Sequence, residues 1–214
     1  MTAEEKDYKV PFSDYAEDSF VEKRSKFTGR LWRVETAEEA VSKIREMRET
    51  YWDATHHCYA YILREGNLMR YSDDGEPQGT AGMPMLDVLR HAGLVNVCCV
   101  VTRYFGGILL GTGGLVRAYT KGAQLAVAAA GIQQMSRFAT LLIACPYNLY
   151  GAVQQILPAQ DCTIEDVDYG ADVTLTVIQP VGRLDALNAA LAEATAGTVY
   201  AEQMEVTFRG RRVQ

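Results

Sequence analysis

The sequence predicts an α+β protein with two domains. With 214 residues, 48% of them hydrophobic and 22% charged, the chain is long enough to bury one large core or two small ones. As far as Ala130, strand-like and helix-like hydrophobic patterns alternate. The remainder follows a simpler plan of strand, helix, hairpin, helix and strand. We therefore place the boundary near residues 131–137, which gives domains of residues 1–133 and 134–214.

The first elements follow from hydrophobic spacing and from local signals. Residues 20–34 alternate loosely in polarity, which predicts one or two strands, and Gly29 suggests a bulge in them. A capping box at residues 36–39 precedes apolar residues at helical spacing, so we expect a helix to follow it. Residues 58–63 and 68–72, separated by a short glycine-containing turn, predict a hairpin.

The rest of the first domain alternates helix and strand. A helix is expected from about residue 82 to Gly93, because proline is tolerated in a first turn and glycine ends helices. The continuous apolar run at residues 97–102 is typical of a central strand. Residues 115–130 then predict a closing helix, which ends at Gly131.

The second domain repeats strands and helices in a recognisable order. We expect a strand at residues 138–143 and a helix at 149–157 that is stopped by Pro158. A hairpin, a helix and a last strand complete the domain at residues 163–168, 172–178, 184–194 and 199–208. The order β-α-β-β-α-β is that of the split βαβ, ferredoxin-like plan.

Composition limits the classes of function. The opening residues 1–9 lack the apolar core of a signal peptide, and no later stretch could span a bilayer, so we expect a cytoplasmic protein without a membrane partner. The five cysteines lack C-x-x-C spacing and predict buried, reduced thiols and no metal site; they are Cys58, Cys98, Cys99, Cys145 and Cys162. The net charge of −6 argues against sequence-blind nucleic-acid binding, yet it permits a local basic groove.

Two glycine-rich segments with charged ends, residues 70–82 and 103–119, are the strongest candidates for a functional site. Each follows a predicted strand and precedes a predicted helix, so each can aim backbone N–H groups at a common cleft. Glycines permit positive φ and close approach of a ligand, and a helix N-terminus offers unpaired N–H donors. We therefore predict an anion site, suited to phosphate, at Gly106, Gly107, Gly111, Thr112, Gly113 and Gly114.

Cations accompany these glycines. Arg117 falls in the first turn of the predicted helix, where it would oppose the helix dipole by up to about 1 kcal/mol, so we expect a negative group nearby. Lys121 lies on the same helical face. The pairs Arg70–Tyr71 and Arg103–Tyr104 combine groups that can hold a phosphate and stack a base, although the tyrosines suit a core equally well.

The carboxylates Asp73, Asp74 and Glu76 leave alternatives open. They could pair internally with Arg103 and Arg117, bind magnesium together with a phosphate, or serve only the turn. The neighbouring histidines at residues 56–57 point to opposite faces of a strand, so one should face the cleft and the other solvent or core.

Four motifs together identify a family resemblance. Residues 54–60, 70–82, 100–107 and 111–119 resemble the YigZ/IMPACT family, in its bacterial two-domain form. The resemblance implies a ribosomal-protein-S-five domain-2-like β/α fold for the first domain. For the second it implies a ferredoxin-like domain similar to a C-terminal domain of elongation factor G. The eukaryotic branch of the family is linked to control of translation during amino-acid starvation. Leu109 stands where many relatives have lysine, which makes the loop less basic.

These observations support one leading hypothesis and two alternatives. The leading one is a non-enzymatic, translation-linked protein that binds RNA, a ribosome-associated factor or another phosphate-bearing partner without a cofactor. Its site would combine Arg70, Arg103, Arg117 and the glycine backbone. One alternative is an enzyme acting on a phosphorylated small molecule, with Asp73 or Asp74 as base or magnesium ligand. The other is a protein–protein interaction module, which the acidic net charge permits.

Overall fold

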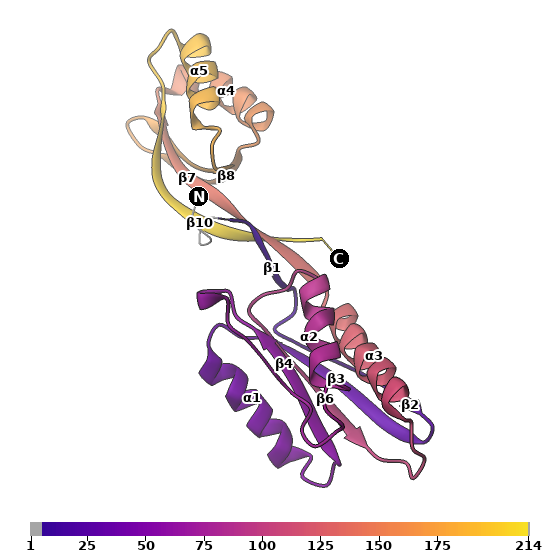
Figure 1. The fold of residues 1–214 in the computed structure, drawn as a ribbon. Helices are drawn as coiled ribbons and strands as arrows, with labels where there is room; N and C mark the ends of the chain where they lie inside the picture. Colours follow the sequence, from indigo (N-terminus) through magenta and orange to yellow (C-terminus); the bar gives the residue numbers. More distant parts are fainter. Residues whose placement is uncertain (1–5, 214) are drawn as a thin grey trace. The chain divides into compact units, whose positions relative to one another are not determined.

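The computed structural model describes residues 6–213 (Figure 1). Residues 1–5, part of the stretch expected to lack a signal peptide, lie outside the described residues. Two compact units are formed, one by residues 8–134 with 211–213 and the other by 135–210 with 6–7. Each unit mixes strands and helices, which confirms the predicted α+β class. The units divide within strand β7 (Ile132–Cys145), not in a linker.

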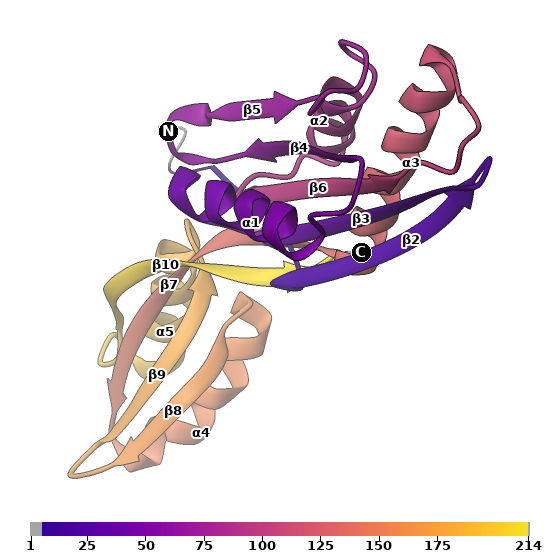
Figure 2. The ribbon, with the colours of Figure 1, turned by 90° about the horizontal axis from the view of Figure 1, so that it is seen from below.

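The N-terminal unit is built on an antiparallel sheet with the strand order β2-β3-β6-β4-β5 (Figure 2). These strands are β2 (Tyr15–Glu22), β3 (Ser25–Arg33), β4 (His56–Ile62), β5 (Met69–Ser72) and β6 (Val97–Tyr104). A short strand, β1 (Tyr8–Pro11), precedes them, and the turn η2 (Glu65–Asn67) joins the predicted hairpin. Helix α1 (Ala37–Thr50) covers one face of the sheet, and α2 (Gly82–His91) and α3 (Thr112–Ala130) cover the other (Figure 1).

One half of the predicted capping box forms at the start of α1, while the Glu39 carboxylate bonds one residue further upstream. Glu39 N donates to Thr36 Oγ1 at 3.2 Å, and the Glu39 carboxylate accepts from Glu35 N at 2.7 Å. The first bond satisfies an N–H group that the helix leaves unpaired, and the second holds the N–H of the residue before the N-cap. The apolar stripe then packs Ala40, Ile44 and other buried residues on the sheet.

The bulge suggested at Gly29 is wrong. Gly29 pairs in regular register with Asp18 of β2 and Val101 of β6. Glycine is needed there for close approach instead, because a Cβ atom would lie 2.2 Å from the backbone oxygen of Gly122 in α3. Helix α3 therefore rests directly on the sheet at this point.

Helix α3 begins at Thr112, three residues before the predicted start at residue 115. Gly111, with φ of 72°, precedes the helix, and Leu115 N donates to Gly111 O at 2.9 Å. Gly113 and Gly114 consequently belong to the first turn, while Arg117 lies in the second. The expected opposition between Arg117 and the helix dipole is thereby weakened, because the dipole effect fades beyond the first turn.

The C-terminal unit has the predicted βαββαβ order. After β7 come α4 (Tyr147–Ile156), β8 (Thr163–Tyr169), β9 (Val173–Pro180), α5 (Leu184–Thr195) and β10 (Ala201–Arg212). In this sheet the order is β1-β7-β9-β8, and β10 also pairs with β7. Alternate residues of β9 are buried in the core. Strand β7 is longer than the predicted 138–143, because its polar first half carries no hydrophobic signal. Helix α4 ends at Ile156, two residues before Pro158 and close to the predicted end, and the 3₁₀ turn η3 (Leu157–Gln160) follows it with the proline in its first turn.

Candidate functional site

The hairpin turn between β2 and β3 carries two cations in an unusual backbone conformation. Lys23 and Arg24 have φ of 44° and 64°, the left-handed region that two-residue hairpin turns require and that asparagine and glycine usually occupy. Each such residue costs about 1–2 kcal/mol relative to glycine. Sequence reasoning missed this turn because it holds neither asparagine nor glycine. Backbone strain of this kind is common at functional sites. Here the strained turn holds two exposed cations at the tip of the hairpin.

The second glycine-rich segment packs against that turn. A Cβ atom at Gly106 would lie 2.0 Å from the backbone carbonyl carbon of Arg24, so only glycine fits. Gly106 N also donates to Ser25 Oγ at 3.1 Å. The loop between β6 and α3 and the β2–β3 turn therefore form one continuous surface.

A pocket of about 190 Å³ lies between this hairpin and α3, and we call it the cationic pocket. Its lining consists of Phe20, Glu22, Lys23, Leu110, Gly114, Arg117, Ala118 and Lys121. Within residues 6–213, none of the three cations forms an ion pair, and Lys121 Nζ lies 4.5 Å from the centre of the Phe20 ring. Three cations against one carboxylate make the pocket basic in a chain whose net charge is −6.

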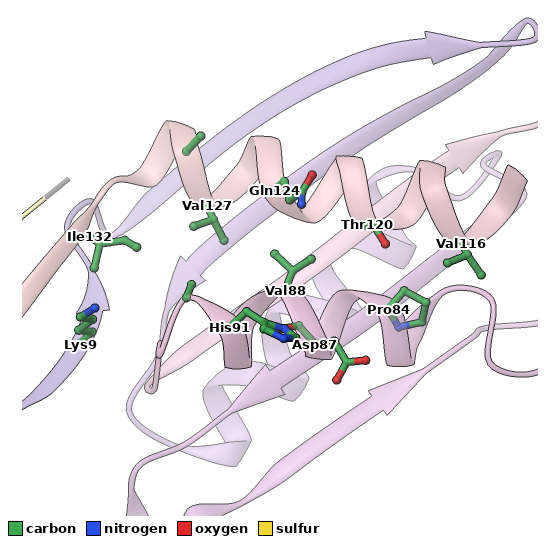
Figure 3. Close-up of a pocket in the computed structure, with 12 residues that line it drawn as sticks. Lys9, Pro84, Asp87, Val88, His91, Val116, Thr120, Gln124, Val127 and Ile132 are labelled. Atoms are coloured by element: carbon green, nitrogen blue, oxygen red, sulfur yellow. The ribbon is translucent and has the colours of Figure 1, made fainter. Parts of the chain in front are cut away.

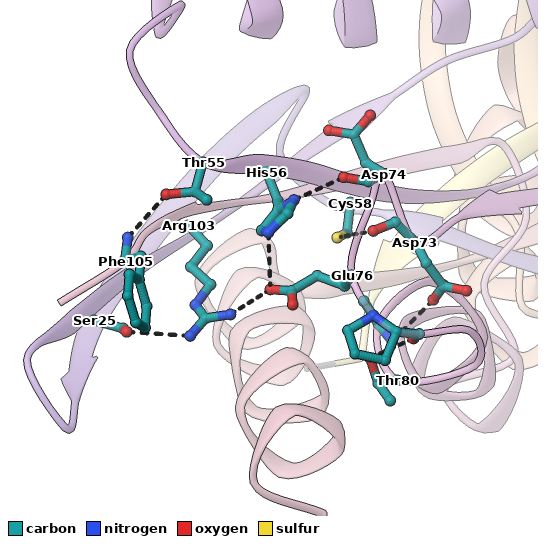
Figure 4. A network of polar contacts seen from close by, with 12 residues as sticks. Ser25, Thr55, His56, Cys58, Asp73, Asp74, Glu76, Thr80, Arg103 and Phe105 are labelled. Carbon is teal, nitrogen blue, oxygen red and sulfur yellow. Dashed lines mark hydrogen bonds and ion pairs between the residues drawn. The ribbon is translucent and has the colours of Figure 1, made fainter. Parts of the chain in front are cut away.

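Arg103 lies beneath the loop and is paired internally (Figure 4). Its Nη1 is 2.6 Å from Glu76 Oε1, and the two side chains are only 5% and 4% exposed. Tyr119 donates its hydroxyl proton to the same carboxylate oxygen at 2.7 Å, and burial raises the pKa of Tyr119. Arg103 Nη2 donates to Ser25 Oγ at 3.3 Å. The internal-pairing alternative therefore holds for Arg103, whereas Arg117 remains exposed.

Asp73 and Asp74 have structural partners as well. Asp73 accepts from Gly79 N at 2.8 Å, Ala81 N at 3.0 Å and Gly82 N at 2.8 Å, so it caps the start of α2. Asp74 accepts from Arg48 Nη2 at 2.6 Å and from His57 N at 2.7 Å. In the described part of the chain, no three His, Cys, Asp or Glu side chains are grouped as metal ligands would be.

Arg70 and Tyr104 do not join the cationic pocket. Arg70 lies opposite Tyr61, whose side chain packs on the α1 face of the sheet. Tyr104 donates its hydroxyl proton to Asp53 Oδ1 at 2.9 Å, just after α1. Tyr71 lies at the sheet edge and is 44% exposed. Successive side chains of a strand point to opposite faces of the sheet. The two members of each predicted pair, Arg70 with Tyr71 and Arg103 with Tyr104, therefore do not share a face.

The two histidines also lie on opposite faces. His56 Nδ1 contacts Asp74 O at 2.8 Å, and its Nε2 is 3.8 Å from Glu76 Oε1 (Figure 4). His57 is buried, with Nδ1 3.2 Å from Thr102 Oγ1 and Nε2 3.1 Å from Tyr51 O. Burial lowers the pKa of His57, so the folded protein favours the neutral ring.

The stability of the N-terminal unit should therefore depend on His57 below neutral pH. The unfolded chain takes up the proton near pH 6.5, before the folded chain does, so the free energy of unfolding should fall as the pH drops through that value. We expect urea unfolding at pH 7.5, 6.5 and 5.5 to give a flatter profile for His57→Gln than for wild type. His91→Gln, which removes an exposed histidine, serves as control. Parallel profiles for His57→Gln and wild type would contradict this assignment.

All five cysteines are buried and free, as predicted. Cys58 is the cysteine nearest the candidate site, and its Sγ donates to Asp73 O at 2.9 Å. Burial raises the pKa of the Cys58 thiol. It therefore stays protonated and is a poor nucleophile.

A larger groove of about 760 Å³ runs between α2 and α3 (Figure 3). Its lining is mainly apolar, with Val88, Val116 and Val127 from the two helices and Asp87 and His91 at its rim. It contains none of the predicted site residues.

Within residues 6–213, none of the helices combines the length and apolar character that crossing a bilayer requires.

Comparison with known proteins identifies both parts of the chain. The family model of the Impact N-terminal domain matches residues 23–127, and that of a domain of unknown function (DUF1949) matches residues 143–198. The IMPACT family member YvyE of Bacillus subtilis is 33% identical over 198 residues, which cover 92% of this chain and 91% of that protein. The IMPACT family member YigZ of Escherichia coli is 36% identical over 180 residues, covering 83% and 88%.

A solved structure supports the same relationship. The crystal structure of a hypothetical protein superposes with a TM-score of 0.59 and 33% sequence identity, and the match covers 93% of this chain and 98% of that one. The sequence identity to these relatives and to this solved structure covers both units of the chain and is not confined to one motif. The chain therefore belongs to the IMPACT family.

Proposed function

We propose that this protein is a non-enzymatic, translation-linked member of its family that binds RNA through phosphate groups at the cationic pocket. One observation carries the proposal: Lys23, Arg117 and Lys121 surround a small pocket and have no ionic partner among the described residues. Phosphate oxygens are the groups that such cations bind best, and nearby backbone N–H groups of α3 add to the attraction. The link to translation rests on the resemblance to the eukaryotic branch of the family.

We favour binding over catalysis because the groups an enzyme would need are occupied. The carboxylates of Asp73, Asp74 and Glu76 each accept hydrogen bonds from the protein itself. Using one as a base or metal ligand would require breaking those bonds and leaving buried groups unpaired. Binding of a phosphate in the cationic pocket requires no such rearrangement. A module that acts only through protein partners would instead show no dependence on phosphate.

Replacing Arg117 by alanine tests the proposal. We expect the affinity for a labelled single-stranded RNA to fall several-fold, and the slope of log K against log salt concentration to shrink by about 0.7–1, the share of one phosphate contact. Fluorescence anisotropy between 50 and 200 mM KCl measures both quantities. Arg45→Ala removes the same charge from the exposed surface of α1, on the opposite face of the sheet, and should change neither. An unchanged affinity and slope in Arg117→Ala would exclude the pocket as the RNA site.

A further inference from the structure

The loop that borders the cationic pocket holds an exposed phenylalanine at the end of a stacked array. The guanidinium of Arg103 lies 5.4 Å from the ring centre of Phe27 and 5.4 Å from that of Phe105. Phe27 is fully buried, whereas Phe105 is 45% exposed. Both contacts are within the range of cation–π attraction. The three side chains Phe27, Arg103 and Phe105 thus form a row that begins in the core of the N-terminal unit and ends with the exposed ring of Phe105.

Phe105 is held in place from several sides. Phe105 N donates to Thr55 Oγ1 at 3.0 Å, and Gly106 N donates to Ser25 Oγ at 3.1 Å (Figure 4). Arg103 is in turn fixed by its 2.6 Å contact with Glu76. A surface group that is already ordered loses little conformational entropy when it binds a ligand. The main chain that carries the ring is therefore fixed, and the ring itself is in contact with the Arg103 guanidinium.

The same loop connects this ring to the cationic pocket. Ile108 and Leu109 are 40% and 81% exposed, and the next residue, Leu110, lines the pocket. On the other side, Lys23 of the pocket is two residues from Ser25, which holds Gly106. The loop that carries this aromatic ring and these exposed apolar side chains thus also contributes Leu110 to the lining of a basic pocket. That combination fits a ligand with both a planar apolar group and a phosphate.

We propose that the loop selects single-stranded RNA, with an unpaired base stacked on Phe105 while a neighbouring phosphate enters the cationic pocket. This inference rests on the proposed function. A duplex keeps its bases stacked inside and offers only its backbone and groove edges, so Phe105, Ile108 and Leu109 could not contact base faces. In an unpaired strand the bases are free to stack on an aromatic side chain. Arg103 then supports the platform from below and does not bind phosphate.

The test compares a labelled single-stranded RNA with a blunt duplex of the same length and sequence, by anisotropy. We expect wild type to prefer the single strand, and Phe105→Ala to lose about fivefold or more of that affinity with little change for the duplex. Phe105→Trp, which keeps an aromatic ring, should retain the preference. Phe12→Ala is the matched control, because Phe12 is 43% exposed and has Arg212 over its ring at 4.6 Å. An RNA carrying 2-aminopurine should show quenching with wild type and not with Phe105→Ala.

The outcomes separate the two proposals. Equal binding of both RNAs, unchanged by Phe105→Ala but reduced by Arg117→Ala, would overturn base stacking and leave phosphate binding in place. Binding of neither RNA would reject both. A preference for the single strand that disappears in Phe105→Ala and returns in Phe105→Trp supports the inference.

Discussion

Replacing Glu76 by alanine is expected to lower the free energy of unfolding by about 3–5 kcal/mol. The carboxylate of Glu76 is the partner of two buried groups, the guanidinium of Arg103 at 2.6 Å and the hydroxyl of Tyr119 at 2.7 Å. The Arg103 side chain is 5% exposed, so water cannot replace the lost partner. Arg103 Nε has no hydrogen-bond partner among the described residues, so without Glu76 the guanidinium would keep only the 3.3 Å hydrogen bond from Nη2 to Ser25 Oγ and no ionic partner. An unpaired buried charge is among the most destabilising results of a single substitution.

Urea or thermal unfolding of Glu76→Ala measures this loss. Glu46→Ala is the control, because Glu46 pairs with Lys43 at 3.0 Å on the exposed surface of α1, where an ion pair contributes about 0–1 kcal/mol. Replacing both partners, Glu76→Met with Arg103→Met, removes the buried charges together and should be less destabilising than Glu76→Ala alone. A loss below about 1 kcal/mol in Glu76→Ala would show that Arg103 finds another partner, against this account.

Replacing Gly29 by alanine is expected to destabilise the N-terminal unit by about 3 kcal/mol, at the upper end of ordinary overpacking. The added Cβ would lie 2.2 Å from the backbone oxygen and 2.9 Å from the carbonyl carbon of Gly122. These are backbone atoms inside α3, so no side chain can rotate away. The helix would have to lift from the sheet, which would also loosen the packing of Gly122 on Val101, where a Cβ at Gly122 would lie 3.1 Å from Val101 Cγ1.

Gly113→Ala provides the matched control for this prediction. Gly113 also lies in α3, but a Cβ there meets only the end of the Arg117 side chain, at 3.7 Å. Alanine also favours a helix over glycine by about 1 kcal/mol, so Gly113→Ala should leave stability unchanged or raise it. Denaturant unfolding of both variants decides the point. Equal stability of Gly29→Ala and Gly113→Ala would refute the close packing of α3 on β3.

Apart from β1, the element order of both units could be predicted because its signals are local. The capping box at Thr36, the hairpin around Gly66 and the hydrophobic spacing of the helices depend on residues close together in the sequence. Local sequence signals did not predict two features, the turn between β2 and β3 and the role of Gly29. The Lys23–Arg24 turn lacks the usual turn residues, and Gly29 is required by a helix that follows some eighty residues later.

The candidate site was predicted only in part. Of the predicted site residues, Gly114, Arg117 and Lys121 line the cationic pocket, whereas Lys23, which also lines it, and Phe105 carried no sequence signal that set them apart. Arg70, Arg103 and Arg117 look equivalent in the sequence, since each borders a glycine-rich segment. In the structure they lie on the α1 face, in the buried network and at the cationic pocket, respectively.

The sequence by itself determined the α+β class, the order of the elements and the family, because these follow from local hydrophobic patterns and from motifs read along the chain. Only the tertiary structure decided which charged groups are available to a ligand. Arg103 and Glu76 are 27 residues apart and meet only when the first glycine-rich segment folds over the end of β6. Their burial makes internal pairing far more favourable than binding of an external anion, while Arg117 stays in solvent and keeps its charge free for a partner.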